Sequence, residues 1–267
     1  MTEGIHGSGA QGANVHDASG HGDARFGLLR FQGPDARKFL QGQLSNDMNE
    51  LRADRLLLAG LHNPQGRVLA LLQLAAPAAD EVIALLSAEL AEATAATLRR
   101  YVLRAKLSIA AEQSAATLAA LAAQVPAVAA YLATQSLAQD IAAGVPQVYG
   151  ATSGAFVAQM LNLDCIGAVS FSKGCYTGQE IIARAHYRGR MKRRMQRFES
   201  NGPAALAPGE AVTLGDGRGA QIVTATVRAD GRTEFLAVTS LEGPTETGTS
   251  TARLAVAQLA LPYALPD

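Results

Sequence analysis

The sequence predicts an α+β fold followed by a small all-β region. Between residues 26 and 143, short apolar runs with strand character are interleaved with segments of helical periodicity. After Pro203 the chain changes to short alternating segments separated by turn residues, which is typical of a small antiparallel β-barrel. No segment repeats at a fixed period, and a length of 267 residues suits two or three domains in one compact body.

The first ordered segment is predicted to be a strand over Phe26–Phe31, which ends at the turn formed by Gly33 and Pro34. Pro34 suits the first turn of a helix, and the apolar side chains that follow it can share one helical face. The end of this helix would place Asn46 and Asp47 at its C-terminus.

Two apolar runs, Leu56–Leu61 and Val68–Leu74, flank turn residues 62–67 and predict a hairpin with a polar tip. Beyond the hairpin we expect a strand, a helix and a strand over Val82–Leu86, Glu89–Leu103 and Lys106–Ala110. The alanine-rich residues 114–143 predict packing helices, with Pro126 ending one helix or opening the next. In the C-terminal region we expect strands over Glu210–Leu214, Gln221–Arg228, Thr233–Thr239 and Arg253–Leu259, with Asp230 and Gly231 as a tight hairpin turn.

Composition excludes several classes of protein. The 23 Lys and Arg residues balance 23 Asp and Glu residues, so no global field would attract nucleic acid or an anionic membrane. Two cysteines are too few for a disulfide scaffold and indicate a reducing, cytoplasmic location. Residues 1–24 lack the apolar stretch of a signal peptide and are predicted to be a flexible leader, and the most apolar later stretch, Thr117–Ala133, is too interrupted to span a membrane.

The segment around Cys175 carries the chemistry that the sequence suggests. Residues 177–180 read Thr-Gly-Gln-Glu and fit a capping box at the start of a helix, which Gly189 can close with a positive φ. Cys175 would then lie just before a helix N-terminus and two residues after Lys173, and both positive charges favour the thiolate. The alternative is a buried structural cysteine, which is the role we expect for Cys165.

A second notable segment is strongly basic. Arg184 to Arg197 contains seven Lys or Arg residues in fourteen positions, together with His186, and no acidic residue. It can be a patch for a polyanion, either RNA phosphates or the glutamate tail of a folate. It can equally be a helix end followed by an edge strand with a solvated basic face. The neutral chain and the single aromatic ring in the segment, Tyr187, slightly favour the solvated face.

Residues 173–180 read KGCYTGQE, which resembles the signature of the YgfZ family of folate-binding proteins, relatives of the glycine-cleavage T-protein. Three further segments resemble motifs of the same family, namely Phe39–Asp47, Asn63–Arg67 and Tyr101–Lys106. The resemblance covers nearly the whole chain after the leader. It implies a ring of three domains around a central folate cleft: residues 25–48 with 140–200 as a first α+β domain, 49–139 as a second, and 201–267 as a C-terminal barrel.

The resemblance also implies a function and a site. It implies binding of tetrahydrofolate or a derivative and support for assembling or maintaining iron–sulfur enzymes, including enzymes that modify tRNA. Cys175 would be the key functional residue, with Lys173 poising its thiol. The partners would be folate, iron–sulfur client enzymes and, through the basic segment, tRNA, with no metal site and no membrane. The residues that we expect to frame the folate are Asn46, Asp47, Asn63, Arg67, Asn162, Tyr176, Gln179, Glu180 and Arg184.

Two alternative functions remain open. One is an RNA-binding or client-binding, chaperone-like module without folate chemistry. The other is a true aminomethyltransferase, which is disfavoured because Leu69 and Ala70 stand where the T-protein carries an acidic pair. Residues 162–164 also read Asn-Leu-Asp, where that enzyme would have Arg-Leu-Glu.

Overall fold

The computed structural model describes residues 25–134, 136–243 and 253–266. The predicted leader 1–24 lies outside the described residues. Helical elements are α1 (Ala36–Gln43), η1 (Met48–Glu50), η2 (Ala88–Leu90), α2 (Ala91–Arg99), α3 (Ala115–Gln124), α4 (Pro126–Thr134), α5 (Leu137–Ala142), η3 (Ala158–Leu161) and α6 (Gln179–Arg188). Strands are β1 (Phe26–Gln32), β2 (Leu57–His62), β3 (Val68–Ala78), β4 (Glu81–Ser87), β5 (Ser108–Glu112), β6 (Arg193–Ser200), β7 (Ala211–Leu214), β8 (Gly219–Val227), β9 (Thr233–Ser240), β10 (Arg253–Leu254) and β11 (Val256–Leu259).

The N-terminal half forms a five-stranded antiparallel sheet in the order β2-β3-β4-β1-β5. The predicted hairpin is present as β2 and β3, and the predicted strand–helix–strand succession is present as β4, α2 and β5. Helix α2 ends at Arg99 rather than at Leu103, and the Leu103 side chain is 87% exposed. Pro126 opens α4, which suits its fixed φ and missing N–H.

The C-terminal half forms a six-stranded sheet in the order β10-β7-β8-β9-β6-β11. A tight turn at Asp230 and Gly231 connects β8 to β9, and Gly231 has the positive φ of 82° that this turn requires. The two strands at opposite ends of the order, β10 and β11, are separated in the chain by Ala255 alone, so one short stretch of chain links both edges. Closure into a complete barrel stays a prediction.

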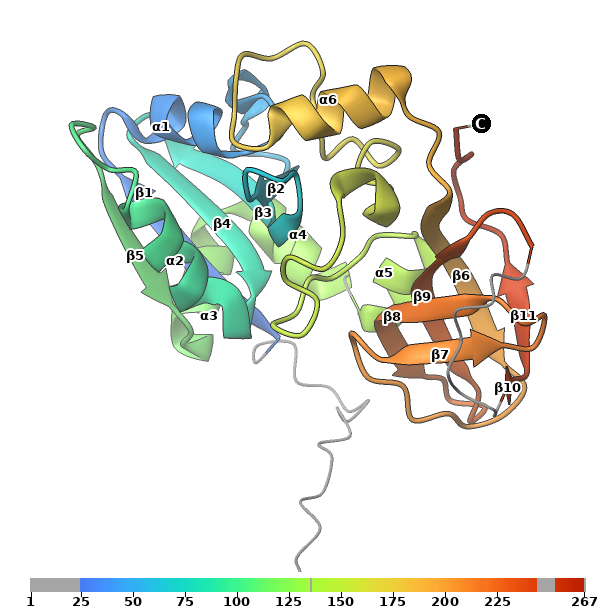
Figure 1. Cartoon of the computed structure of the whole chain (residues 1–267). Helices are drawn as coiled ribbons and strands as arrows, with labels where there is room; N and C mark the ends of the chain where they lie inside the picture. The colour runs from blue at the N-terminus through green and yellow to red at the C-terminus, as the bar shows by residue number, and fades with distance from the viewer. Residues whose placement is uncertain (1–24, 135, 244–252, 267) are drawn as a thin grey trace, which may run out of the picture.

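Three apolar clusters form the core, and one of them joins the two halves. One face of the five-stranded sheet packs on α3 and α4 through residues such as Leu28 and Leu121. The other face joins a large cluster that reaches from Leu29 through Leu163 to Val238 in β9, so one core spans both sheets. A third cluster around Phe198 and Phe235 fills the six-stranded sheet. The sheets lie side by side, and α6 lies across the top of the molecule between α1 and the C-terminal sheet (Figure 1).

The division into domains stays a prediction, but the strand pairing crosses the boundaries predicted for the two α+β domains. Strand β1 comes from the predicted first domain but pairs on both sides, with β4 and with β5, which come from the predicted second domain. The reason is that side chains on both faces of β1, such as Leu28 and Phe31, are fully buried, so the strand belongs inside a sheet. Strand β6 was also assigned to the first domain but pairs with β9 and β11. The described residues form two sheets. The alanine-rich segment that follows β5 forms helices and adds no strand to either sheet.

Within the described part of the chain, no helix is long and apolar enough to cross a membrane.

Candidate functional site

The loop 173–178 is anchored on one side by the buried ammonium group of Lys173. This residue is 7% exposed, and its Nζ donates to the backbone carbonyls of Gln41, Leu44 and Asn46 at 2.6 to 2.8 Å. Carbonyls at a helix C-terminus lack partners within the helix and attract cations, and these three lie at or just after the end of α1. Burial lowers the pKa of Lys173 to about 8, against the opposing charge of Asp47. The ammonium therefore fastens the loop to α1.

The same loop is anchored on its other side to the tip of the β2–β3 hairpin. Tyr176 is 7% exposed, and its ring lies 6.3 Å from the ring of His62. Gly178 adopts a φ of 83°, and a Cβ at this position would lie 2.5 Å from the carbonyl oxygen of Asn63. Only glycine fits this close approach. The loop 173–178, which we call the signature loop, is thus held between α1 and the hairpin.

Cys175 lies between these two anchors and is exposed. Its thiol has no hydrogen-bond partner among the described residues, so the loop presents it to solvent. Cys165 differs: it is half-buried, and its Sγ lies 3.6 Å from Oδ1 of Asp164 and 3.8 Å from Nη1 of Arg194. Burial raises the pKa of Cys165 to about 11, with the negative charge of Asp164 adding to the effect. The two cysteines therefore have different environments.

The predicted capping box is wrong. Helix α6 begins at Gln179, and its N-cap is Gly178 in a left-handed conformation without a side-chain capping bond. The close packing of Gly178 on the hairpin dictates this conformation, so Thr177 does not occupy the capping position. The helix end also differs, because Gly189 is extended with a φ of −106° rather than left-handed. Consequently the carboxylate of Glu180 is exposed and makes no hydrogen bond within the described part of the chain.

Three of the residues predicted to bind folate make hydrogen bonds that hold loops of the protein. The side-chain amide of Asn46 donates to the carbonyls of Leu58 and Gly167, both at 2.8 Å. Asp47 caps η1 by accepting from a backbone N–H, and Asn63 accepts two N–H bonds across the hairpin tip. These contacts bring the residues after α1, the hairpin and the loop before α6 into one neighbourhood.

Two other predicted ligands also make hydrogen bonds within the protein. Arg67 donates to the carbonyl of Ala155 at 2.6 Å. Asn162 has a positive φ of 56° and is fully buried, donating to the carbonyl of Met195 and accepting from Arg194. By contrast, the side chains of Gln179, Glu180 and Arg184 have no hydrogen-bond, ion-pair or ring contact among the described residues.

The sequence did not single out His62, which lies at the centre of this neighbourhood. It is 2% exposed, and neither ring nitrogen has a hydrogen-bond partner among the described residues. Burial lowers the pKa of His62 to about 4, with a smaller opposing effect from the backbone of Gly60, on which the ring packs. A histidine at the end of an apolar strand, just before an Asn-Pro turn, was the available indication.

The basic segment divides into two parts. Arg194 and Arg197 are buried or half-buried and paired: Arg194 forms two bonds to the Asp164 carboxylate at 2.9 and 3.0 Å, and Arg197 pairs with Glu234. The remaining cations are exposed, and we call them the exposed basic surface: Arg184, Arg188, Arg190, Lys192 and Arg193.

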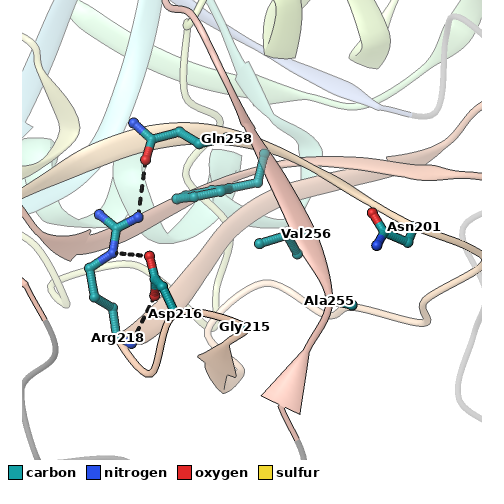
Figure 2. Close-up of a pocket in the computed structure, with 8 residues that line it drawn as sticks. Asn201, Gly215, Asp216, Arg218, Ala255, Val256 and Gln258 are labelled. Carbon is teal, nitrogen blue, oxygen red and sulfur yellow. Dashed lines mark hydrogen bonds and ion pairs between the residues drawn. The ribbon is translucent and has the colours of Figure 1, made fainter.

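Two pockets lie away from the signature loop. The larger, about 300 Å³, opens in the six-stranded sheet beside Arg218 and Asp216 (Figure 2). The Arg218 guanidinium is already engaged, by Asp216 at 2.7 Å and by the side chains of Gln196 and Gln258 at 3.0 Å. The smaller, about 100 Å³, lies beside the Arg194–Asp164 pair. None of the predicted folate residues lines either pocket. No group of His, Cys, Asp or Glu in the described ranges could hold a metal ion.

Comparison with known proteins places the chain among relatives. No family model matches it. The solved structure of the glycine cleavage system aminomethyltransferase T from Bartonella henselae is similar in fold, with a TM-score of 0.61 and 15% identity, covering 82% of this chain and 77% of that chain.

The relatives found by sequence are more similar to the chain than that solved structure is, at about twice its sequence identity. An uncharacterized protein of Haemophilus influenzae is 29% identical over 66% of this chain and 71% of its own length. The tRNA-modifying protein YgfZ of Edwardsiella ictaluri is 29% identical over 82% of this chain and 83% of its own length. The tRNA-modifying protein YgfZ of Serratia proteamaculans is 31% identical over 76% of this chain and 79% of its own length. The chain therefore belongs to the family of the tRNA-modifying protein YgfZ.

Proposed function

We propose that this protein binds a reduced folate, tetrahydrofolate or a derivative, and supports the assembly or maintenance of cytoplasmic iron–sulfur enzymes, including enzymes that modify tRNA. Its functional group would be the Cys175 thiol. The observation that carries the proposal is the exposure of this thiol on a loop fastened at both sides, by Lys173 and by Gly178. A thiol held in this way is accessible to a partner without a large rearrangement.

The folate part of the proposal rests on the family and on the side chains that remain free. Gln179 and Glu180 offer hydrogen-bonding groups for a pterin, and Arg184 offers a cation for the glutamate tail. Asn46, Asp47, Asn63, Arg67 and Asn162 would shape the site by fixing its loops. Tyr176 is mostly buried, so it would contribute its ring edge or hydroxyl rather than an open face.

Aminomethyl transfer is the less favoured alternative. Leu69 is half-buried and Ala70 is fully buried, so neither position offers a carboxylate to the reacting nitrogen. We therefore propose a binding and support role in place of transferase chemistry.

A complementation experiment tests the thiol. In a strain lacking the corresponding protein, Cys175→Ser is expected to fail to restore the activity of iron–sulfur enzymes, because serine does not form the anion at neutral pH. Cys165→Ser is the matched control, since it also removes a thiol, and it should complement. Full complementation by Cys175→Ser would exclude a nucleophile or ligand role.

Calorimetric titration with tetrahydrofolate tests the ligand. Arg184→Gln is expected to weaken binding about tenfold or more, since a charge-assisted hydrogen bond contributes about 1.5 to 3 kcal/mol. Absence of heat with the unaltered protein would favour the rival module that binds RNA or client proteins without folate.

A further inference from the structure

An aromatic cluster lies beside the signature loop and is exposed to solvent. The rings of Phe171 and His186 are stacked, with centroids 3.7 Å apart and an angle of 15° between their planes. Tyr187 meets His186 edge-on at 4.8 Å and Phe171 at 6.1 Å. Phe171 packs on the core on one side, whereas Tyr187 is 68% exposed. These three rings form an aromatic platform that packs on the core on one side and is exposed to solvent on the other.

The exposed basic surface adjoins this platform. Arg184 and Arg188 lie on α6 one turn from each other, on either side of the aromatic pair in the chain, and Lys192 follows in the segment after the helix. The side chains of these three have no partner among the described residues. Arg190 makes only an exposed ion pair with Glu242, at 3.7 Å. The cations are thus largely unneutralised by the protein itself, although the whole chain has zero net charge.

We infer that the platform of Phe171, His186 and Tyr187, together with the exposed basic surface beyond Arg184, binds unpaired nucleotides of an RNA. A base would stack on Tyr187, and the flanking cations would contact the phosphates. This combination of aromatic rings and cations is how proteins bind single strands. In a duplex the bases are stacked on each other and offer no face to a side chain, so loops and single-stranded ends are the expected targets.

Other anionic partners fit less well. An acidic peptide matches the cations but offers a flat ring to Tyr187 only where it contains an aromatic residue. A folate offers a ring and carboxylates, but a tail that contacts Arg184 leaves the other four cations of the exposed basic surface without an anion from the ligand. The identity of the RNA rests on the proposed role in tRNA modification, whereas the binding surface does not include Cys175.

Fluorescence anisotropy with a labelled, unstructured RNA of about twelve nucleotides tests the inference. The unaltered protein, without folate, should bind with a Kd below about 1 μM at physiological salt, tighter than nonspecific binding. Tyr187→Ala should weaken binding about five- to 150-fold, the range expected for one stacked base. A fully paired RNA of the same composition should bind more weakly than the single strand.

The contribution of the cations is measured separately, from the salt dependence of the RNA affinity. Replacing both Arg188 and Lys192 with Gln should lower the slope of log affinity against log salt by about 1.4, at roughly 0.7 for each lost phosphate contact, whereas Tyr187→Ala should leave the slope unchanged. The matched controls lie in the loop after α2, where Tyr101 is 48% exposed and Arg100 and Arg104 are also exposed. Tyr101→Ala and the Arg100→Gln/Arg104→Gln pair should retain binding.

Any one of three results would overturn the inference, and a fourth would reassign the surface. The first three are a micromolar or weaker Kd for the unaltered protein, equal losses in Tyr101→Ala and Tyr187→Ala, and equal binding of paired and unpaired RNA. Complete displacement of the RNA by tetrahydrofolate would assign the surface to folate instead. Cys175→Ser should bind RNA normally, so loss of complementation with retained RNA binding separates the proposed function from this inference.

Discussion

Two neighbouring parts of one basic segment have opposite roles in this molecule. The exposed basic surface ends at Arg193, and the next residue in β6, Arg194, is buried with its side chain 4% exposed. Consecutive side chains of a strand point to opposite faces, so two adjacent arginines can meet solvent and core. Arg194 faces the core, where the carboxylate of Asp164 has the same low exposure.

Burial, rather than residue type, therefore decides whether an arginine side chain has a structural role or is available to a partner. A buried arginine is tolerated only because its charge is paired and hydrogen-bonded, so its removal leaves a carboxylate isolated in the core. An exposed arginine interacts mainly with solvent and remains available to a partner. The segment from Arg184 to Arg197 therefore contains both a structural ion pair and a group of exposed cations, which we propose contact RNA.

The largest expected effect follows from breaking the buried pair. Arg194→Gln should lower the free energy of unfolding by about 3 to 5 kcal/mol, because it leaves the buried Asp164 unpaired. Urea denaturation followed by circular dichroism measures this change. The double variant Arg194→Met/Asp164→Leu removes both charges and should recover much of the loss. If the double variant is as unstable as Arg194→Gln, packing rather than charge explains the effect.

Buried groups should also respond to pH in ways that exposed groups do not. Burial lowers the pKa of His62 from 6.5 to about 4. Between these two pH values only the unfolded chain protonates this histidine, so acidification should lower the free energy of unfolding by about 3 kcal/mol. The pKa of Asp140 is raised to about 6 by burial, with Arg25 and Gln147 opposing. Between pH 6 and 3.8 the Asp140 carboxyl is therefore protonated in the folded protein and ionised in the unfolded chain. Acidification over this range should raise the free energy of unfolding by a similar amount.

These two contributions nearly cancel in the unaltered protein, and single variants should separate them. His62→Leu should become more stable, relative to the unaltered protein, as the pH falls from 6.5 to 4, whereas Asp140→Asn should become less stable. Urea midpoints measured at both pH values test this. Variants whose pH profiles run parallel to that of the unaltered protein would show that neither group titrates differently in the folded state.

Much of the fold follows from local sequence, and most of the site does not. Apolar runs and turn residues predicted β1, the β2–β3 hairpin and the β8–β9 turn, because those elements depend on neighbouring residues. The capping box failed because Gly178 packs on Asn63, a contact between residues far apart in the chain. The division of the basic segment depends on Asp164, and the aromatic platform depends on Phe171, which the segment itself does not contain. Such contacts are visible only after folding.

A smaller effect is expected at Lys173, which is buried like Arg194 but is paired with carbonyls rather than with a carboxylate. Lys173→Met removes the donor from three carbonyls and should cost about 2 kcal/mol, because no bare charge is left behind. Hydrogen exchange of the amides between residues 174 and 178 should become faster than in the unaltered protein, because the loop loses one anchor. Unchanged exchange would mean that Gly178 alone holds the loop.

The smallest effect on stability is expected for an exposed arginine, Arg188. Arg188→Gln makes the same chemical change as Arg194→Gln but should alter the free energy of unfolding by only about 0.3 to 0.5 kcal/mol, through the dipole of α6, whose last turn contains Arg188. Salt provides a further distinction. At about 1 M salt the Debye length falls to about 3 Å, so the effect of Arg188→Gln should vanish while that of Arg194→Gln persists. A cost above about 1.5 kcal/mol for Arg188→Gln would indicate that this arginine is structural, which would remove one of the cations assigned to the RNA.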